Sequence, residues 1–386
     1  MIIERAERIK PIEAYYFAKK LKEIRAMNED GGDQVLNLGI GSPDLLPPQS
    51  VIPKLLEAAK EKEANKYQSY IGLPDLRAAF AGWYKRHFNV EVNPLNEVLP
   101  LLGSKEGINH ISMAFLNPGD EVLIPNPGYP AYGTVSRLAG ARVRYYDLTK
   151  ERQWLPNLEA LEREDLSKVK IMWVNYPHMP TGAKASKSLF EQLIRFAKKH
   201  QILICHDNPY AFILNDEPLS ILSIEGAKDV AIELTSLSKC YHMAGWRVGA
   251  VSGKREYLDA ILTFKSNVDS GMYKPVQKAA ITALNSPDSW FDTINQSYNE
   301  RRQIAFEIMD ALGCTYDRDS AGMFVWGKIN SGAEAESISN HILHQARVFI
   351  TPGHIFGTNG SNYLRISLCS TPEDLQEALQ KIKDIQ

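Results

Sequence analysis

Hydrophobic and polar residues follow two different periods along the chain. Short strand-like runs, several of them continuously apolar, occur at residues 99–102, 121–125, 142–146, 170–174, 202–206, 230–234 and 248–252. Segments with helical periodicity separate them. The runs that start at 170, 202 and 230 lie about thirty residues apart, the length of one strand–helix–strand unit. Continuous apolar strands are typical of sheets covered on both faces. The pattern predicts an α/β fold with a mostly parallel central sheet.

The two ends of the chain show a different rhythm. An amphipathic helix is predicted over Ile12–Ala26, and a long helical stretch over 276–312 leads into a smaller set of strands and helices. We therefore expect three parts. Residues 1–45 form an N-terminal arm that belongs partly to a small domain, residues 46–275 form the large domain, and residues 276–386 form the small C-terminal α+β domain.

Composition and charge exclude several classes of protein. The 386 residues carry 44 Lys and Arg against 46 Asp and Glu, so the chain lacks the basic excess of a protein that binds nucleic acid or an anionic membrane. No apolar run reaches the roughly 18 residues of a membrane span, and the N-terminus does not resemble a signal peptide. The cysteines are scattered, without a C-x-x-C pair. We expect a cytoplasmic protein with no disulfide framework and no metal site.

Polar residues that suit chemistry follow the predicted strands. In open α/β sheets, ligands bind beyond the carboxyl ends of the strands. Gly103-Ser104-Lys105 follows the first strand and opens a helix, an arrangement that suits a phosphate. The other strand ends should bring further polar side chains to the same rim: Asp207, Tyr210, Ser236, Ser238, Lys239 and Arg247.

This set of residues suits a phosphorylated aldehyde cofactor better than it suits hydrolysis or metal binding. A lysine amine can form an imine with an aldehyde, while Arg247 and the serines can hold a phosphate. The Asp207 carboxylate would keep a ring nitrogen protonated, because a neighbouring anion stabilises the cation. The protonated ring would then act as an electron sink.

A long motif around Lys239 resembles a known family. Residues 236–249, Ser-Leu-Ser-Lys-Cys-Tyr-His-Met-Ala-Gly-Trp-Arg-Val-Gly, are similar to the lysine signature of class I/II aminotransferases. These are fold type I enzymes that use pyridoxal 5'-phosphate. The resemblance covers nearly the whole chain and keeps the family's order of motifs. Segments such as 103–107, 206–210 and 265–271 resemble the subgroup of LL-diaminopimelate aminotransferases.

The resemblance implies roles for residues outside the lysine motif. Residues 38–44 resemble the substrate loop, which makes Gly39 a substrate-binding residue, and Arg365 in Tyr363–Ser367 would grip the substrate's α-carboxylate. Tyr129 would stack on the cofactor ring, and Tyr70 would reach the phosphate in the partner subunit. Gly103, Ser104, Lys105, Ser236, Ser238 and Arg247 would surround the cofactor, with Lys239, Asp207 and Tyr210 as the catalytic groups.

The implied function is transamination. An L-amino acid and a 2-oxo acid would exchange an amino group by a ping-pong reaction through a Lys239 imine, with glutamate and 2-oxoglutarate as one pair. The resemblance also implies a homodimer whose active sites are shared through Tyr70 and residues 267–271. Two alternatives remain open: a C–S lyase or cyclising synthase that uses the same cofactor, and a non-catalytic ligand-sensing module of this fold.

Simple structural interpretations stand beside these roles. Ser104 is a common type of helix N-cap. Tyr70 and Tyr129 are aromatics of the kind that often only pack, and Arg365 could pair with any carboxylate.

One position departs from the family pattern. Met179 stands where the family usually has an asparagine that donates a hydrogen bond to the cofactor's phenolic oxygen. Methionine has no donor. We expect Tyr210 to make this contact instead, with help from His178.

The missing donor gives a testable prediction about the Lys239 imine. The phenolate loses a competing partner, so the imine should hold its proton to a higher pH than in relatives with the asparagine. A pH titration of the bound cofactor's absorbance should therefore give a lower imine pKa for Met179→Asn than for the wild type. An unchanged pKa would contradict this account of Met179.

Overall fold

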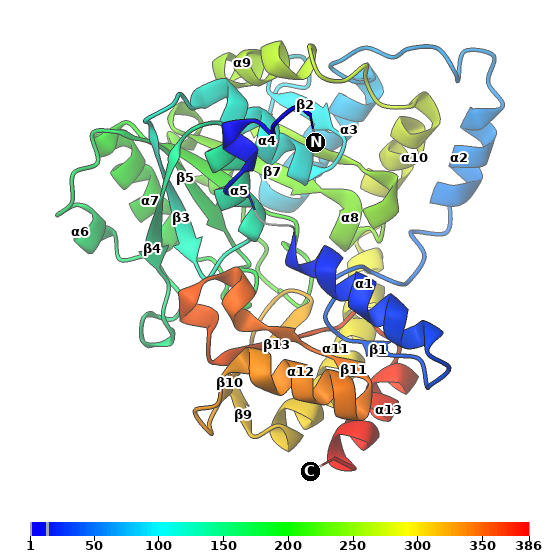
Figure 1. Cartoon of the computed structure of the whole chain (residues 1–386). Coiled ribbons are helices and arrows are strands. Elements are labelled where there is room, and N and C mark those ends of the chain that lie inside the picture. Colours follow the sequence, from blue (N-terminus) through cyan, green and yellow to red (C-terminus); the bar gives the residue numbers. More distant parts are fainter. Residues whose placement is uncertain (1, 13–14, 386) are drawn as a thin grey trace.

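The centre of the molecule is a seven-stranded sheet (Figure 1). The structure is a computed structural model, and it describes residues 2–12 and 15–385. Strand β8 runs antiparallel to both of its neighbours, and the other neighbouring pairs are parallel, which confirms the predicted fold class. In spatial order the strands are β2 (Val98–Leu101), β8 (Gly249–Gly253), β7 (Ala231–Ser236), β6 (Leu203–Asp207), β5 (Val169–Asn175), β3 (Glu121–Asn126) and β4 (Arg142–Asp147).

Helices cover both faces of this sheet. Successive side chains of a strand point to opposite faces, so Cys205 of β6 packs on the face of α4, α5 and α9 while Ile204 packs on the face of α3 and α7. The helices of this large unit are α2 (Val51–Ala59), α3 (Pro74–Phe88), α4 (Ser104–Phe115), α5 (Pro130–Leu138), α6 (Leu158–Leu161), α7 (Lys187–His200), α8 (Leu237–Cys240), α9 (Arg255–Lys265) and α10 (Lys274–Leu284). Both faces of the central sheet are therefore shielded from water, as its apolar strands require.

A smaller unit combines the two ends of the chain. Strand β1 (Leu36–Asn37) pairs in parallel with β11 (Val348–Phe349), and Lys20 of α1 donates to Asn340 of α12 at 2.8 Å. Figure 1 shows α1 beside the C-terminal helices. The remaining elements are α1 (Tyr16–Glu29), α11 (Ser289–Ala311), β9 (Cys314–Tyr316), β10 (Phe324–Ile329), α12 (Ala335–Ala346), β12 (Thr351–Pro352), β13 (Tyr363–Ser367) and α13 (Pro372–Lys383).

Two helices differ from the sequence-based expectation. The stretch 276–312 is not one helix, because α10 ends at Leu284 and α11 begins at Ser289. Pro287 lies in the break, where it lacks the amide hydrogen that a continuous helix needs. The N-terminal helix begins at Tyr16 rather than Ile12 and runs past Ala26 to Glu29. Positions 13 and 14 of the expected helix lie outside the described residues.

The chain also contains short 3-10 helices that connect the main elements. They are η1 (Glu7–Ile9), η2 (Lys150–Arg152), η3 (Ile221–Ser223), η4 (Ala227–Asp229), η5 (Ala244–Trp246), η6 (Gly353–Phe356) and η7 (Thr358–Gly360). The boundaries at residues 45 and 275 between the expected domains stay a prediction. Over residues 2–12 and 15–385, no helix combines the length and the apolar character that crossing a membrane demands.

Candidate active site

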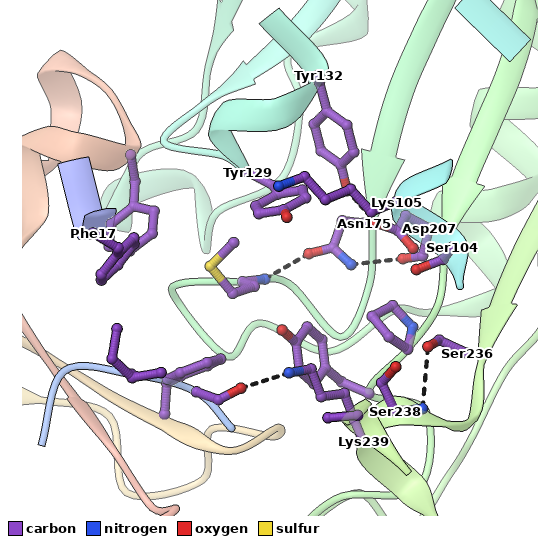
Figure 2. Close-up of a pocket in the computed structure, with 18 of the residues that line it drawn as sticks. Phe17, Ser104, Lys105, Tyr129, Tyr132, Asn175, Asp207, Ser236, Ser238 and Lys239 are labelled. Carbon is purple, nitrogen blue, oxygen red and sulfur yellow. Dashed lines mark hydrogen bonds between the residues drawn. The ribbon is translucent and has the colours of Figure 1, made fainter. Parts of the chain in front are cut away.

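A cavity of about 610 Å³ contains most of the predicted site residues. It is lined by residues from the carboxyl ends of the large sheet and by residues of the small unit. Figure 2 shows Ser104, Asp207, Ser236 and Lys239 together on one side and Phe17 across the gap. The predicted residues that line it are Ser104, Lys105, Tyr129, Asp207, Tyr210, Ser236, Ser238, Lys239, Arg247 and Arg365. Gly39, Tyr70 and Gly103 are not among the lining residues.

Lys239 lies in α8, directly after the central strand β7, and its amine points into the cavity. Its Nζ donates a hydrogen bond to the carbonyl oxygen of Gly41 at 2.5 Å. Burial lowers the pKa of Lys239 from its ordinary value, because the ammonium form is poorly solvated there. A larger fraction of the amine is therefore neutral and can act as a nucleophile or a base.

Asp207 is the last residue of β6 and is buried beside Lys239. Its Oδ2 accepts a hydrogen bond from the Tyr132 hydroxyl at 2.8 Å, while its Oδ1 is buried without a partner in the described structure. Burial raises the pKa of Asp207 to about 6, although the Tyr132 hydrogen bond and the charges of His206 and Lys239 oppose this rise. An orphaned carboxylate oxygen inside a cavity needs a donor from a ligand.

Arg247 and the start of α4 form a cradle for an anion. The Arg247 guanidinium donates to the carbonyl oxygens of Ala244 at 2.9 Å and Leu102 at 3.3 Å, and its Nη1 lies 3.5 Å from the Ser238 hydroxyl. Gly103, at φ +87°, is in a left-handed conformation, and a Cβ there would lie 2.1 Å from the Arg247 Nη2. Only glycine therefore lets the guanidinium approach the helix start, where free amides favour a phosphate.

Arg365 of β13 presents a second, separate cation to the cavity. Its Nη2 donates to the carbonyl oxygen of Gly39 at 2.7 Å, and three phenylalanine rings surround the guanidinium, at 4.0 Å for Phe324, 4.5 Å for Phe356 and 5.7 Å for Phe17. No carboxylate of the described residues pairs with it. Burial lowers its pKa to about 10, so it remains cationic at neutral pH. It is available to a carboxylate of a ligand.

Several lining residues escaped the sequence-based prediction. Tyr132 holds Asp207 and stacks on Trp173 with ring centroids 4.9 Å apart. Asn175 donates to the backbone oxygen of Asp207 at 2.6 Å and accepts from the Met179 amide at 2.8 Å. Asn175 could have been found as the polar residue that ends strand β5. Tyr132 offered only its position three residues after Tyr129.

Among the other residues singled out from the sequence, Lys105 lines the cavity, whereas Gly39 and Tyr70 do not. The Lys105 ammonium lies 5.0 Å from the centre of the Tyr15 ring, and the Gly39 carbonyl supports Arg365. Tyr70 is 45% exposed. The Met179 sulfur lies 3.4 Å from the Arg365 Nη1, so this side chain faces the guanidinium. His178 does not line the cavity, because its Nδ1 pairs with the Thr181 hydroxyl at 2.8 Å and it is buried elsewhere.

A second polar cluster lies behind the start of α4. Glu106, His110 and Asp269 each place one ligand-type atom within 4.8 Å of the others. The Lys265 ammonium already lies 2.7 Å from Asp269, and Glu106 accepts from the Leu102 amide at 2.6 Å. The cluster therefore fastens residue 269 to helix α4. The expectation that the protein has no metal site stays a prediction.

Comparison with known proteins assigns the family. Residues 33–382 match the family model described as aminotransferase class I and II. The chain belongs to this family. The aminotransferase is 41% identical over 384 residues to an LL-diaminopimelate aminotransferase of Dehalococcoides mccartyi, covering 98% of this chain and 97% of the relative.

Solved structures agree with this assignment. The apo structure of BacF from Bacillus subtilis is 35% identical, with a TM-score of 0.94 over 100% of this chain and 98% of that one. A single mutant of the Thermus thermophilus aspartate aminotransferase is 25% identical, with a TM-score of 0.92 and full coverage of both chains. The aminotransferase therefore shares its whole fold with these enzymes.

The enzyme is a pyridoxal-phosphate-dependent aminotransferase. The residues of the cavity fit this cofactor. The orphaned Asp207 Oδ1 can accept a hydrogen bond from a protonated ring nitrogen, and the cradle of Arg247, Ser104 and Ser236 suits the phosphate. The buried Lys239 amine would supply the group that bonds the aldehyde carbon.

The hydrogen bond from Tyr132 gives a prediction about the pH dependence of cofactor binding. Asp207 must be ionised to pair with the ring nitrogen, and the Tyr132 donor favours its ionised form. Tyr132→Phe should therefore raise the Asp207 pKa further. When the pH is lowered, the variant should lose affinity for pyridoxal phosphate at a pH about one unit higher than the wild type does. Titrating the apoenzyme with cofactor from acidic to alkaline pH measures this shift.

Tyr146→Phe is the matched control. Its hydroxyl is also buried, but it donates to the Trp173 carbonyl oxygen at 2.7 Å and does not touch Asp207. This variant should keep the wild-type pH dependence. If the two variants behave alike, Tyr132 has no specific role at Asp207.

Proposed function

We propose that the enzyme transfers an amino group between an L-amino acid and a 2-oxo acid, with glutamate and 2-oxoglutarate as one pair. The single observation that carries this proposal is the Arg365 guanidinium, which is buried in the cavity without a carboxylate partner among the described residues. Its two nitrogens can bind the α-carboxylate that amino acids and 2-oxo acids share. The same cavity holds the buried Lys239 amine.

The side chains divide the work of the reaction. Bound pyridoxal phosphate supplies an electron sink that stabilises negative charge at the substrate's Cα. Arg365 fixes the α-carboxylate and so orients the Cα–H bond. The Lys239 amine, whose pKa is lowered by burial, would take the proton from the substrate's Cα and deliver it to the cofactor carbon that keeps the amino nitrogen. Asp207 would hold the proton at the cofactor's ring nitrogen, and Tyr129 would pack against the ring.

We propose LL-diaminopimelate as the other amino acid. The support is the name of the relatives, which are 41% identical over almost the full chain, together with the position of Lys105. This ammonium lines the cavity, 5.0 Å from the centre of the Tyr15 ring. It can meet a carboxylate at the distal end of a long amino acid, whereas a short or aromatic substrate would leave it unused.

The first experiment follows the visible absorbance of the purified enzyme. Glutamate should convert the absorbance of the bound cofactor, and 2-oxoglutarate should restore it. The same conversion rate measured with LL-diaminopimelate, aspartate, methionine and phenylalanine should be highest for LL-diaminopimelate. A higher conversion rate with one of the other amino acids would contradict LL-diaminopimelate as the substrate. Release of ammonia or a thiol without reversible conversion would favour a lyase, and Lys239→Ala with unchanged turnover would favour a sensing module.

The role of Arg365 gives a second prediction for this site. Arg365→Lys keeps the positive charge but loses the two parallel hydrogen bonds, so kcat/KM for glutamate should fall at least about 100-fold. Cofactor affinity should stay near the wild-type value, because Arg365 lies away from the Arg247 cradle. An equal loss of cofactor binding would show that the substitution disturbs the whole cavity.

We also propose that the enzyme is a homodimer with shared active sites. Residues 68 and 271 lie together, since a Cβ on Gly271 would be 2.7 Å from the Gln68 carbonyl oxygen. Around them the surface exposes apolar side chains, with Tyr67 91% and Val268 58% exposed. Large exposed apolar groups on adjacent segments are typical of an interface. Tyr70 lies in the first of these segments, is 45% exposed and can reach a second copy of the chain.

Mixing two inactive variants tests this arrangement. If Tyr70 serves the partner's phosphate, Tyr70→Ala and Lys239→Ala should each lose activity. An equimolar mixture that exchanges subunits should regain about a quarter of the wild-type activity, because about half of its dimers are mixed and each mixed dimer has one intact site of two. Tyr67→Ala is the control from the same segment, and a stronger effect there would move the contact to Tyr67. A monomer in sedimentation with full activity would contradict the dimer.

A further inference from the structure

A histidine and a glutamate are sealed in the core directly behind the cofactor site. His206 precedes Asp207 on β6, so its side chain points to the opposite face of the sheet. Both His206 and Glu233 are fully buried. The His206 Nδ1 lies 2.8 Å from the Glu233 Oε2, and its Nε2 lies 3.0 Å from the backbone carbonyl oxygen of Tyr176. Both ring nitrogens of His206 therefore face oxygen atoms.

This geometry decides where the protons lie. A carbonyl oxygen can only accept, so the Nε2 must carry a hydrogen. The Glu233 carboxylate receives the Ser220 hydroxyl on both oxygens, at 3.0 and 2.9 Å, and the Ile221 amide on Oε2 at 3.0 Å. Donors that converge on these oxygens are typical of the ionised carboxylate, which leaves the second proton on the His206 Nδ1. The contacts of the pair fit an imidazolium beside a carboxylate.

Other groups around His206 and Glu233 do not alter this assignment of the protons. Tyr84 of α3 shares a hydrogen bond with the Thr235 hydroxyl at 2.7 Å, and burial together with the Glu233 charge keeps its pKa well above the ordinary value, so it is neutral. From α7 the Phe190 ring meets the imidazole edge-on at 5.0 Å. On the other face, Asp207 accepts a hydrogen bond from Tyr132. It also interacts electrostatically with Tyr129, Tyr210 and Lys239.

The imidazolium acts on Asp207 through the sheet. Burial opposes ionisation of Asp207, and the charges of His206 and Lys239 favour it. Lys239 exchanges a proton during the proposed reaction, so its charge is not constant. His206 has no contact with solvent, and its partner Glu233 is equally buried, so neither group takes part in the proposed proton exchange.

We propose that His206 is a permanent imidazolium held by Glu233, and that it is a positioning residue whose charge keeps Asp207 ionised toward the cofactor's ring nitrogen. This inference concerns the cofactor site and holds whichever amino acids the enzyme converts.

The first test reads the protonation of His206 directly. In enzyme with ¹⁵N-labelled histidine, the spectrum of the nine histidine rings should lose one signal in His206→Gln, which assigns it. In the wild type, apo and loaded with pyridoxal phosphate, both His206 ring nitrogens should carry a proton at neutral and mildly alkaline pH. A His206 ring with one unprotonated nitrogen would overturn the proposal.

The second test reads Asp207 in the apoenzyme, so it does not depend on activity. The ¹³C signal of the Asp207 carboxyl, assigned with Asp207→Asn, is titrated in each variant. In His206→Gln the titration should move upward by about one pH unit. Phe190→Leu removes packing from the imidazole but leaves the charge, so its titration should match the wild type. A folded His206→Gln with an unchanged Asp207 titration would overturn the proposal.

Glu233→Gln supplies an independent variant should His206→Gln not fold. Without the carboxylate, an uncompensated imidazolium in the core is costly, so His206 should lose a proton at neutral pH. The Asp207 titration should then rise as it does in His206→Gln. If His206 becomes neutral and Asp207 does not respond, the imidazolium has no influence on the cofactor site.

Discussion

The active site depends on charged groups that are removed from water before a substrate arrives. Burial lowers the pKa of Lys239 and Arg365 and raises that of Asp207. Each shift weakens the charged form, and each group lacks a full set of protein partners among the described residues. The Asp207 Oδ1 and the Arg365 Nε have none. In the proposed reaction, a cofactor and a carboxylate substrate would complete these contacts. The cost of burial in the free enzyme would then favour ligands that carry the missing partners.

Successive side chains of a strand point to opposite faces of the sheet, so a group on the far face can offset the cost of burying Asp207. Along β6, Cys205 and Asp207 point to the face of α4 and α5, while Ile204 and His206 point to the face of α3 and α7. One strand can therefore present a carboxylate to the cofactor and a counter-charge to the core. The Glu233 partner comes from β7 in direct register with His206, and β7 ends at the residues that precede Lys239. The two central parallel strands thus carry both the chemistry and its electrostatic support.

The sequence predicted the parts of the site that follow a simple rule of position. Lys239, Asp207 and Ser104 stand directly after apolar strands, and parallel strands bring such residues to one rim. Arg247 follows from its fixed distance to Lys239 in the family's motif. The aromatic cage of Arg365 could not be predicted, because Phe17, Phe324 and Phe356 come from three distant segments and each is typical of ordinary core packing. Tyr132 escaped for a similar reason, since a tyrosine in an amphipathic helix carries no signal for a buried carboxylate.

The loop over residues 39–44 ties the separate charged groups into one site. Its Gly39 carbonyl accepts from Arg365, its Gly41 carbonyl accepts from Lys239, and its Asp44 forms a two-pronged ion pair with Arg301 of α11 at 2.7 and 2.8 Å. Arg301 is itself buried, so this pair is a firm anchor of the loop on the small unit. A Cβ at Gly39 would lie 2.3 Å from the Phe349 ring, which leaves the backbone no room to withdraw. The carbonyl oxygens that accept from Arg365 and Lys239 are therefore two residues apart on one stretch of backbone. In the proposed reaction this spacing would set the distance between the substrate's carboxylate and its reacting carbon.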